Sequence, residues 1–300
     1  SAGAVLDGFV VTAGKAESDG DNYGGGLRVS DNAQVTLRNL RITGNYASKS
    51  GGGVSLRGST GSIARCSFQN NAAPGLATYD GGGGLYVEES VLDIANSAFS
   101  GNVTANLGGG INLTFGSRPQ APSQIYGVLV FGNAAKYGGG LSARRSNYEL
   151  VNATLAGNTA SQTGGGIYNN DSAGLISNGI LWTNTPNNIQ FGELVVSYCL
   201  TTGFTSGEGN LEVDPGFMDP DSGDFHLRAG SPAIDSGSNE LLPALLSSDL
   251  DGYARVSDGD TVAGAQVDRG AYEWPGYGLT VDVVGSGQVT ESRDSGTFPF

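Results

Sequence analysis

Runs of three glycines recur along the chain at a nearly constant interval, and no other feature restricts its fold as strongly. The runs begin at Gly24, Gly51, Gly82, Gly108, Gly138 and Gly164, so successive copies lie 26 to 31 residues apart. Periods of this length are typical of solenoids, in which each repeat contacts only its neighbours.

An asparagine marks a second fixed place in each repeat. It follows an apolar residue and two others, as in Ile42–Asn45 and Phe99–Asn102, and the last copy lacks a glycine run. The six asparagines are Asn45, Asn71, Asn102, Asn133, Asn158 and Asn184. We expect their amides to stack in a structural ladder that closes hydrogen bonds inside a turn, without a catalytic role.

Apolar residues alternate in three short bursts per repeat. The first full copy has Leu27 and Val29, then Val35 and Leu37, then Leu40 and Ile42. Alternation predicts strands with one buried face, here three strands and three turns per coil. Units this small bury their apolar face only by stacking at about 4.8 Å. We therefore predict an all-β, right-handed parallel β-helix of about seven coils, with a loop-rich capping region at its C-terminal end.

Composition excludes some partners. The formal charge is −14, with 29 acidic and 15 basic residues, and no basic stripe offers a site for nucleic acid. No apolar run is long enough to span a membrane. The chain starts and stops within patterned segments, so we interpret it as an internal piece of a longer protein.

The repeat marks resemble a known family. A glycine run followed by Ile, Leu or Val, together with Phe-x-x-Asn, is similar to the polymorphic outer-membrane protein repeat of bacterial surface β-helices. Seven later segments resemble the choice-of-anchor Q region, a closing module of secreted β-helices: Tyr198–Leu200, Gly209–Asn210, Asp214–Asp219, Gly223–Leu227, Gly230–Gly237, Asp249–Gly252 and Val267–Glu273. From Gly278 the chain resembles the first hairpin of an internalin B-repeat.

These resemblances divide the chain into three parts. Residues 1–200 are expected to form the β-helix, 201–274 the closing region, and 275–300 the beginning of a small surface repeat. The relatives imply export, surface display, and adhesive or structural roles, and some of them act on carbohydrates.

A catalytic groove would need acidic side chains from successive coils to converge. We expect Asp80, Glu88, Glu89, Asp93, Glu149 and Asp171 to fall at unlike positions of their coils. Only Glu88, Arg57 and Arg144 share a place in the repeat, which indicates a surface contact. Asp93 and Arg65 are the first candidates if a lyase or glycoside hydrolase site exists.

The remaining reactive side chains favour structural roles. Cys66 and Cys199 lie about five coil rises, or roughly 24 Å, apart in the predicted stack, too far for a disulfide. Cys66 takes the place of Leu40 in the next coil, so we expect it in the core. His226, the only histidine, lies in a predicted strand without a triad partner.

The acidic C-terminal segment is the best candidate for a metal site. Its candidate ligands are Asp214, Asp219, Asp221, Asp224, Asp249 and Asp251. Alternating carboxylates along a turn suit Ca²⁺, although aspartates that only cap their own turns would give the same pattern.

Together these features favour a non-catalytic extracellular or cell-surface protein, a rigid rod for adhesion or assembly. Tyr23, Tyr79 and Tyr137 lie beside glycine runs, where they would either stack on glycans or a partner or cover a coil edge. Glycans, surface proteins and further copies of the chain are the candidate partners, because a solenoid end exposes unpaired strand edges. The alternative is a polysaccharide lyase or glycoside hydrolase acting in a lateral groove.

Overall fold

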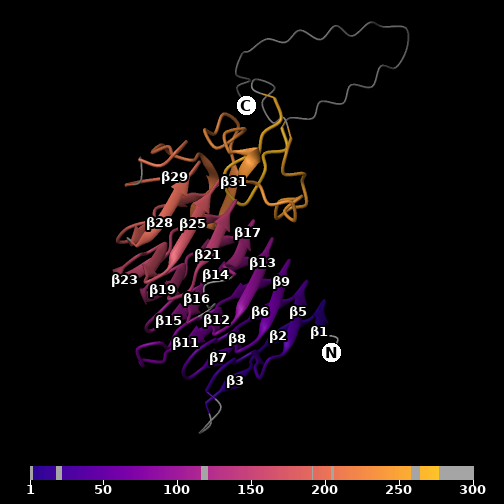
Figure 1. Ribbon diagram of the computed structural model, residues 1–300, viewed down its shortest axis with the longest axis vertical. Coiled ribbons are helices and arrows are strands. Elements are labelled where there is room, and N and C mark those ends of the chain that lie inside the picture. The colour runs from indigo at the N-terminus through magenta and orange to yellow at the C-terminus, as the bar shows by residue number, and fades with distance from the viewer. Residues whose placement is uncertain are drawn as a thin grey trace, which may run out of the picture.

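The computed structural model describes residues 3–17, 22–115, 121–190, 192–203, 206–257 and 264–276. They form a right-handed parallel β-helix whose four sheets run side by side along the long axis (Figure 1). A closing region of residues 206–276 follows it. Among the residues described, no helix is long and apolar enough to cross a membrane.

Two long sheets take one strand from each coil. Sheet A holds β1 (Ala4–Asp7), β5 (Gln34–Arg38), β9 (Thr60–Ala64), β13 (Val91–Ala95), β17 (Ser123–Tyr126), β21 (Tyr148–Val151), β25 (Ala173–Ser177) and β28 (Glu193–Ser197). Sheet B holds β2 (Val10–Thr12), β6 (Arg41–Thr43), β10 (Ser67–Gln69), β14 (Ala98–Ser100), β18 (Leu129–Phe131), β22 (Thr154–Ala156), β26 (Ile180–Trp182) and β29 (Leu200–Thr201).

The other two sheets are shorter. Sheet C holds β3 (Lys15–Ala16), β7 (Tyr46–Ala47), β11 (Ala72–Ala73), β15 (Val103–Thr104), β19 (Ala134–Tyr137) and β23 (Thr159–Thr163). Sheet D holds β4 (Leu27–Val29), β8 (Val54–Arg57), β12 (Leu85–Glu88), β16 (Ile111–Thr114), β20 (Leu141–Arg144), β24 (Ile167–Asn170) and β27 (Ile189–Gln190).

A complete coil therefore has four strands, and the prediction of three was wrong. The extra strand belongs to sheet C and lies between the ladder asparagine and the glycine run. In several coils, such as that of β7, it has only two residues. Two residues cannot show alternation, so this strand leaves no periodic signal in the sequence.

The predicted register of the core is confirmed. Ile42 pairs with Phe68, and Phe68 pairs with Phe99, so equivalent residues of successive coils lie directly above one another. Both phenylalanines are fully buried and their rings stack with centroids 4.5 Å apart. Stacked apolar columns of this kind extend along the inside of the β-helix and together form one continuous core from Val35 to Cys199.

The glycine runs are required by two different constraints. Gly51 has a φ of +68°, a left-handed conformation that glycine adopts without a Cβ clash. Gly52 lies so close to the next coil that an added Cβ would stand 2.4 Å from the carbonyl oxygen of Ala72. The first constraint is a turn and the second is a close approach between coils.

The two cysteines are free, as predicted, and both are buried, although burial was predicted for Cys66 alone. Cys66 lies in the core at the coil level expected for the equivalent of Leu40. Burial raises the pKa of both thiols, to about 12 for Cys199, so both behave as small apolar residues.

The closing region caps the last coil and then continues back along the β-helix. Leu211 pairs with Leu200 and extends sheet B by one bridge. The chain then forms the antiparallel strands β30 (Phe217–Asp219) and β31 (Asp224–Leu227) and the 3₁₀ turns η1 (Pro220–Ser222) and η2 (Asn239–Leu241). Figure 1 shows this orange and yellow segment beside the later coils, whereas the sequence predicted a cap at the end alone.

A change in one outward column of sheet B explains why the closing region lies on the flank. The column runs through Arg41 and Ser67 in early coils and then through Leu129, Thr154 and Ile180. Leu129 and Ile180 form a separate apolar cluster with residues of the closing region. An apolar outer face must be covered, and the closing region packs over this column at Leu129 and Ile180, while Thr154 between them accepts from the N–H of Ala271.

The predicted surface repeat from Gly278 lies outside the described residues, which end at Gly276.

Candidate functional site

The six marked asparagines form one continuous buried column. In Asn102, the Nδ2 donates to Asn133 Oδ1 and to the carbonyl oxygen of Phe68, each at 2.9 Å. Its Oδ1 accepts from the Nδ2 and the backbone N–H of Asn71, at 2.9 and 3.0 Å. All four hydrogen-bonding positions of the amide are thus used, which leaves none for a ligand.

The same amide-to-amide bond joins every pair of neighbours in the column, from Asn45 to Asn71 and onwards to Asn184. The bonds measure 2.9 to 3.0 Å, and the column ends on Asn188. At the other end, the backbone N–H of Gly14 donates to Asn45 Oδ1 at 2.9 Å. The asparagines tie each coil to the next with neutral groups.

Two carboxylates share an outward column of sheet A, which corrects the expectation that the acids fall at unlike positions. Asp93 pairs with Gln124, and Gln124 pairs with Glu149, so the acids stand two coils apart on one face. Each lies nine residues before its ladder asparagine, Asn102 or Asn158. Alignment on the ladder alone would have revealed the pair.

The surroundings of these two acids differ. Burial raises the pKa of Asp93, which lies in an open groove of about 380 Å³ with Thr36 and Ser62. Glu149 accepts a 2.7 Å hydrogen bond from the hydroxyl of Tyr126. An acid whose pKa is raised by burial and an acid that accepts a hydrogen bond from Tyr126 therefore lie on the same surface.

Arg65, the other early candidate, does not join this groove. It lies at the corner between sheets A and B with a φ of +52°. A hydrogen bond from Asn39 and the positive charges of Arg38 and Arg65 lower the pKa of Asp7 in the first coil. The structure thus relates Arg65 to Asp7 rather than to Asp93.

The predicted surface pair on sheet D is present. Arg57 pairs in register with Glu88, and their side chains form an ion pair. The Arg57 guanidinium also lies over the Tyr23 ring, 4.4 Å from its centroid. Arg144, two coils beyond Glu88 in the same column, lies 4.6 Å from the Tyr79 ring. These tyrosines cover neighbouring coils, which was one of their two expected roles.

The six candidate calcium ligands do not converge. Asp214 accepts from the N–H of Gly216 at 2.8 Å, and Asp249 accepts from the N–H groups of Asp251 and Tyr253 at 3.0 and 2.8 Å. No group of three or more His, Cys, Asp or Glu side chains is placed to hold a metal within the described ranges. Calcium binding stays a prediction. A melting temperature that depends on calcium would support it.

Two of these aspartates instead hold His226. The Nδ1 contacts Asp224, the Nε2 lies 2.8 Å from Asp251, and the ring lies 4.0 Å from the Tyr272 ring. Burial alone would lower the pKa of His226, but its bonds to the two carboxylates outweigh burial and raise it. The histidine joins β31 to the turn at Asp251, in agreement with a structural role.

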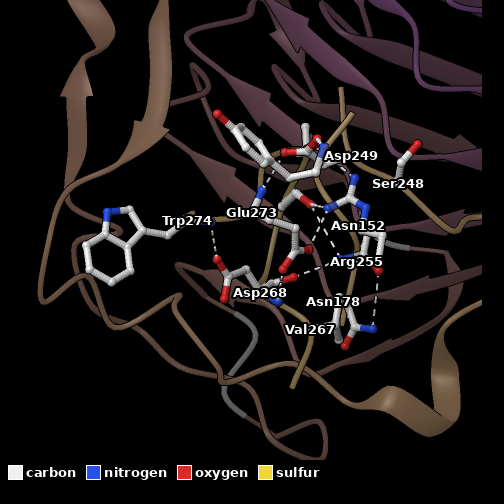
Figure 2. A network of polar contacts seen from close by, with 12 residues as sticks. Asn152, Asn178, Ser248, Asp249, Arg255, Val267, Asp268, Glu273 and Trp274 are labelled. Carbon is white, nitrogen blue, oxygen red and sulfur yellow. Dashed lines mark hydrogen bonds and ion pairs between the residues drawn. The ribbon is translucent and has the colours of Figure 1, made fainter. Parts of the chain in front are cut away.

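A buried charged network lies at the centre of the closing region (Figure 2). Arg255 and Glu273 are each about 1% exposed and form an ion pair of 3.0 Å, and Arg255 also donates to the carbonyl oxygens of Gly270 and Ala271. Glu273 accepts from the N–H of Asp268 and donates its own N–H to Asp249. The sequence motifs around Asp249 and Asp268 therefore mark a structural network.

Burial penalises the charges of Arg255, Asp268 and Glu273 in this network. It raises the pKa of Glu273 and lowers that of Arg255, while their mutual attraction opposes both shifts. Burial also raises the pKa of Asp268 to about 6, against hydrogen bonds from the backbone of Asp235 and Trp274. Three carboxylates with one guanidinium would be costly without these bonds.

A second asparagine column anchors the closing region to the β-helix. The residues occupy the corner between sheets A and B in left-handed conformations. Asn96 Nδ2 donates to the carbonyl oxygen of Ser248 at 3.1 Å, and Asn152 Nδ2 donates to that of Asp268 at 2.8 Å. Asn178 exchanges two bonds with the backbone of Ser238. These anchors were not predicted from the sequence, although each lies six residues before its ladder asparagine, Asn102, Asn158 or Asn184.

Two hollows lie where the closing region meets the coils. One, of about 430 Å³, lies over sheet A and is lined by apolar residues such as Leu175, Val195 and Leu241. The other, of about 330 Å³, lies over sheet B between Trp182 and β30–β31. Neither hollow could be expected from the repeat, since both require the closing region to fold back.

A family model described as a right handed beta helix region matches residues 17–155. The match ends within β22, before the closing region begins. The chain matches no curated protein and no solved structure. The match supports the fold, and fold does not determine activity.

Proposed function

We propose that the protein is a non-catalytic rigid rod displayed outside the cell, where it serves adhesion or assembly. The supporting observation is the lack of convergent charge on the coils. In the described part of the column that holds Asp93 and Glu149, no Arg, Lys or His faces the two acids. A lyase acting on an acidic polymer requires a base beside groups that neutralise a carboxylate.

The continuous ladder supports the same proposal. A rod for adhesion must keep its shape over its length, and here every coil is joined to the next by buried amide bonds and parallel strand pairs. The exterior location rests on the resemblance to surface β-helices, and the acidic charge suits a solvated surface.

The test is a panel of uronate polymers and neutral polysaccharides, assayed for new reducing ends and unsaturated products, together with binding to intact cells and isolated glycans. We expect binding without product formation. Turnover of any polymer by the purified chain would contradict the proposal.

A second candidate is an inverting glycoside hydrolase, favoured by the shared column of Asp93 and Glu149. Two coil rises amount to about 9.6 Å, close to the separation of about 6.5 to 9.5 Å between the carboxylates of inverting enzymes. Asp93, with its raised pKa, would donate a proton, and Glu149 would activate water. Any activity found in the panel must be lost in Asp93→Asn and Glu149→Gln and kept in Ser100→Ala, on sheet B and outside this groove.

A further inference from the structure

The hollow over sheet B combines an aromatic surface with a charged rim. Phe217 and Phe225 lie beneath it, each 4% exposed, with their rings edge to face at 5.2 Å. Trp182, which is half-buried, contributes the wall from β26. Flat aromatic faces of this kind suit the C–H face of a ring-shaped ligand.

The rim carries two carboxylates and one guanidinium. Asp214, Asp221 and Arg228 are exposed at the mouth of the hollow. Asp214 uses one oxygen to accept from the N–H of Gly216, and Arg228 donates to the carbonyl oxygen of Met218 at 2.8 Å. Within the described residues, Asp221 makes no hydrogen bond or ion pair. Acceptors and a donor thus surround an apolar floor.

A strained residue marks the same place. The residue that follows each sheet B strand from β2 to β26 has a positive φ, and in the earlier coils it is Ala13, Asn70 or a glycine such as Gly132 or Gly157. At the hollow this position is Thr183, with a φ of +54°. A β-branched residue is strained in this conformation, and such strain concentrates at functional sites. The Thr183 hydroxyl donates to the carbonyl oxygen of Trp182 at 2.7 Å, and Thr183 lines the hollow. A glycine at this position would adopt the same backbone conformation without strain.

We propose that this hollow binds a neutral sugar ring, either free or at the end of a glycan chain. The ring would stack on Trp182, and its hydroxyl groups would bond to Asp221, Asp214 and Arg228. The rim carries one more negative than positive charge, so it would repel a uronate or sialylated ring. This inference deepens the proposed adhesive function and rests on it for the class of ligand.

The experiment is a titration with neutral methyl pyranosides of the gluco, galacto, manno and N-acetylglucosamine series, and with matching oligosaccharides. Binding is followed by saturation-transfer NMR and by Trp182 fluorescence in a Trp274→Phe background. The oligosaccharides distinguish a terminal from an internal sugar ring. We expect saturable binding that weakens at least tenfold in Asp221→Asn and in Trp182→Ala.

Two variants make the test specific. Asp219→Asn removes a neighbouring exposed carboxylate that does not line the hollow, and it should bind as the unaltered protein does. Thr183→Gly should raise the melting temperature, because it relieves the backbone, and at the same time weaken sugar binding.

Absence of saturable binding to every neutral sugar, or equal losses in Asp219→Asn and Asp221→Asn, would overturn this inference. Neither result would contradict the proposed function as a rigid rod. Turnover of a polysaccharide would contradict the proposed function without affecting the binding site, so the two failures can be told apart.

Discussion

The coils and the closing region bury their polar groups in different ways. In the coils, one neutral amide contact is repeated from Asn45 to Asn184, and each amide satisfies its neighbours. In the closing region, Arg255, Glu273 and Asp268 form a charged network that occurs once. A neutral repeated network gives stability that does not depend on pH, whereas a buried charged one makes stability depend on protonation.

The largest effect is expected from breaking the ladder at its middle. Asn102→Ala removes the acceptor of two donors of Asn71 and the donor to Phe68 and Asn133. Each buried group left without a partner costs about 1–3 kcal/mol, so we expect a loss of about 4 kcal/mol or more in the free energy of unfolding, measured by urea denaturation.

The control for the ladder is Ser100→Ala, on the outer face of the same coil, which should change the free energy of unfolding by about 0.5 kcal/mol or less. If the two substitutions lowered the free energy of unfolding equally, the ladder would contribute no more to stability than the outer face of the coil.

A somewhat smaller loss is expected from the charged network. Arg255→Met leaves the Glu273 carboxylate buried without its cation and should destabilise the closing region by about 3–4 kcal/mol. Local opening measured by hydrogen exchange should rise in residues 206–276 while the early coils keep their protection. The double variant Arg255→Met with Glu273→Met should recover part of the loss, and a further loss in the double variant would contradict this account.

The corner anchors should contribute less than either network. Asn152→Gly keeps the left-handed backbone but removes the bond to the carbonyl oxygen of Asp268. We expect about 1–2 kcal/mol of weakened docking, seen as faster exchange in the closing region. Asn39→Gly, at the same corner of the first full coil, should leave that exchange unchanged. If both variants speed hydrogen exchange in the closing region, the corner asparagines affect that region through the stability of the coils and not through direct bonds to it.

The smallest effect is expected at the surface of the coils. Arg57→Ala removes an ion pair to Glu88 whose side chains are 35% and 20% exposed. Solvent screens such pairs, so thermal unfolding should show a loss of no more than about 1 kcal/mol, which decreases further at high salt. A loss as large as that of Asn102→Ala would mean that surface charges determine the stability of the rod.

The β-helix could be predicted because the same sequence marks recur in successive coils. The glycine runs and ladder asparagines indicated the register, and Ile42, Phe68 and Phe99 pair as expected. The two-residue strands of sheet C were missed because they are too short to alternate. The Asp93–Glu149 column was missed, although each acid lies at the same distance from its ladder asparagine.

The sequence motifs of the closing region identified it, but they did not predict its three-dimensional structure. Its contacts join residues far apart in sequence, such as Asn96 with Ser248 and Asn152 with Asp268. Nothing repeats there to give a register. The calcium ligands predicted from the sequence included Asp249 and Asp224, which the structure uses for turns and for His226.

The sign of the pH dependence follows from the shifted groups. The pKa of Asp268, about 6, and that of Glu273 are raised by burial, so the folded state holds protons that the unfolded state has released, and stability falls as pH rises. The raised pKa of His226 acts in the same direction, because its contribution is lost as pH rises through the folded pKa. The coils contain no histidine, and burial moves the pKa values of Tyr148 and Cys66 further above neutral pH. The raised pKa of Asp93 acts in the same direction as those of the closing region, but this carboxyl lies on the outer face of sheet A and makes no bond to the ladder.

Hydrogen exchange with mass spectrometry at pH 5.5 and pH 8, corrected for the intrinsic exchange rate, compares the two regions within one sample. We predict that protection in residues 235–276 increases at pH 5.5, while protection around the ladder from Asn45 to Asn158 stays the same at both values. Equal changes in both regions, or a change confined to the coils, would contradict the account that neutral amides hold the rod and buried charges hold the closing region.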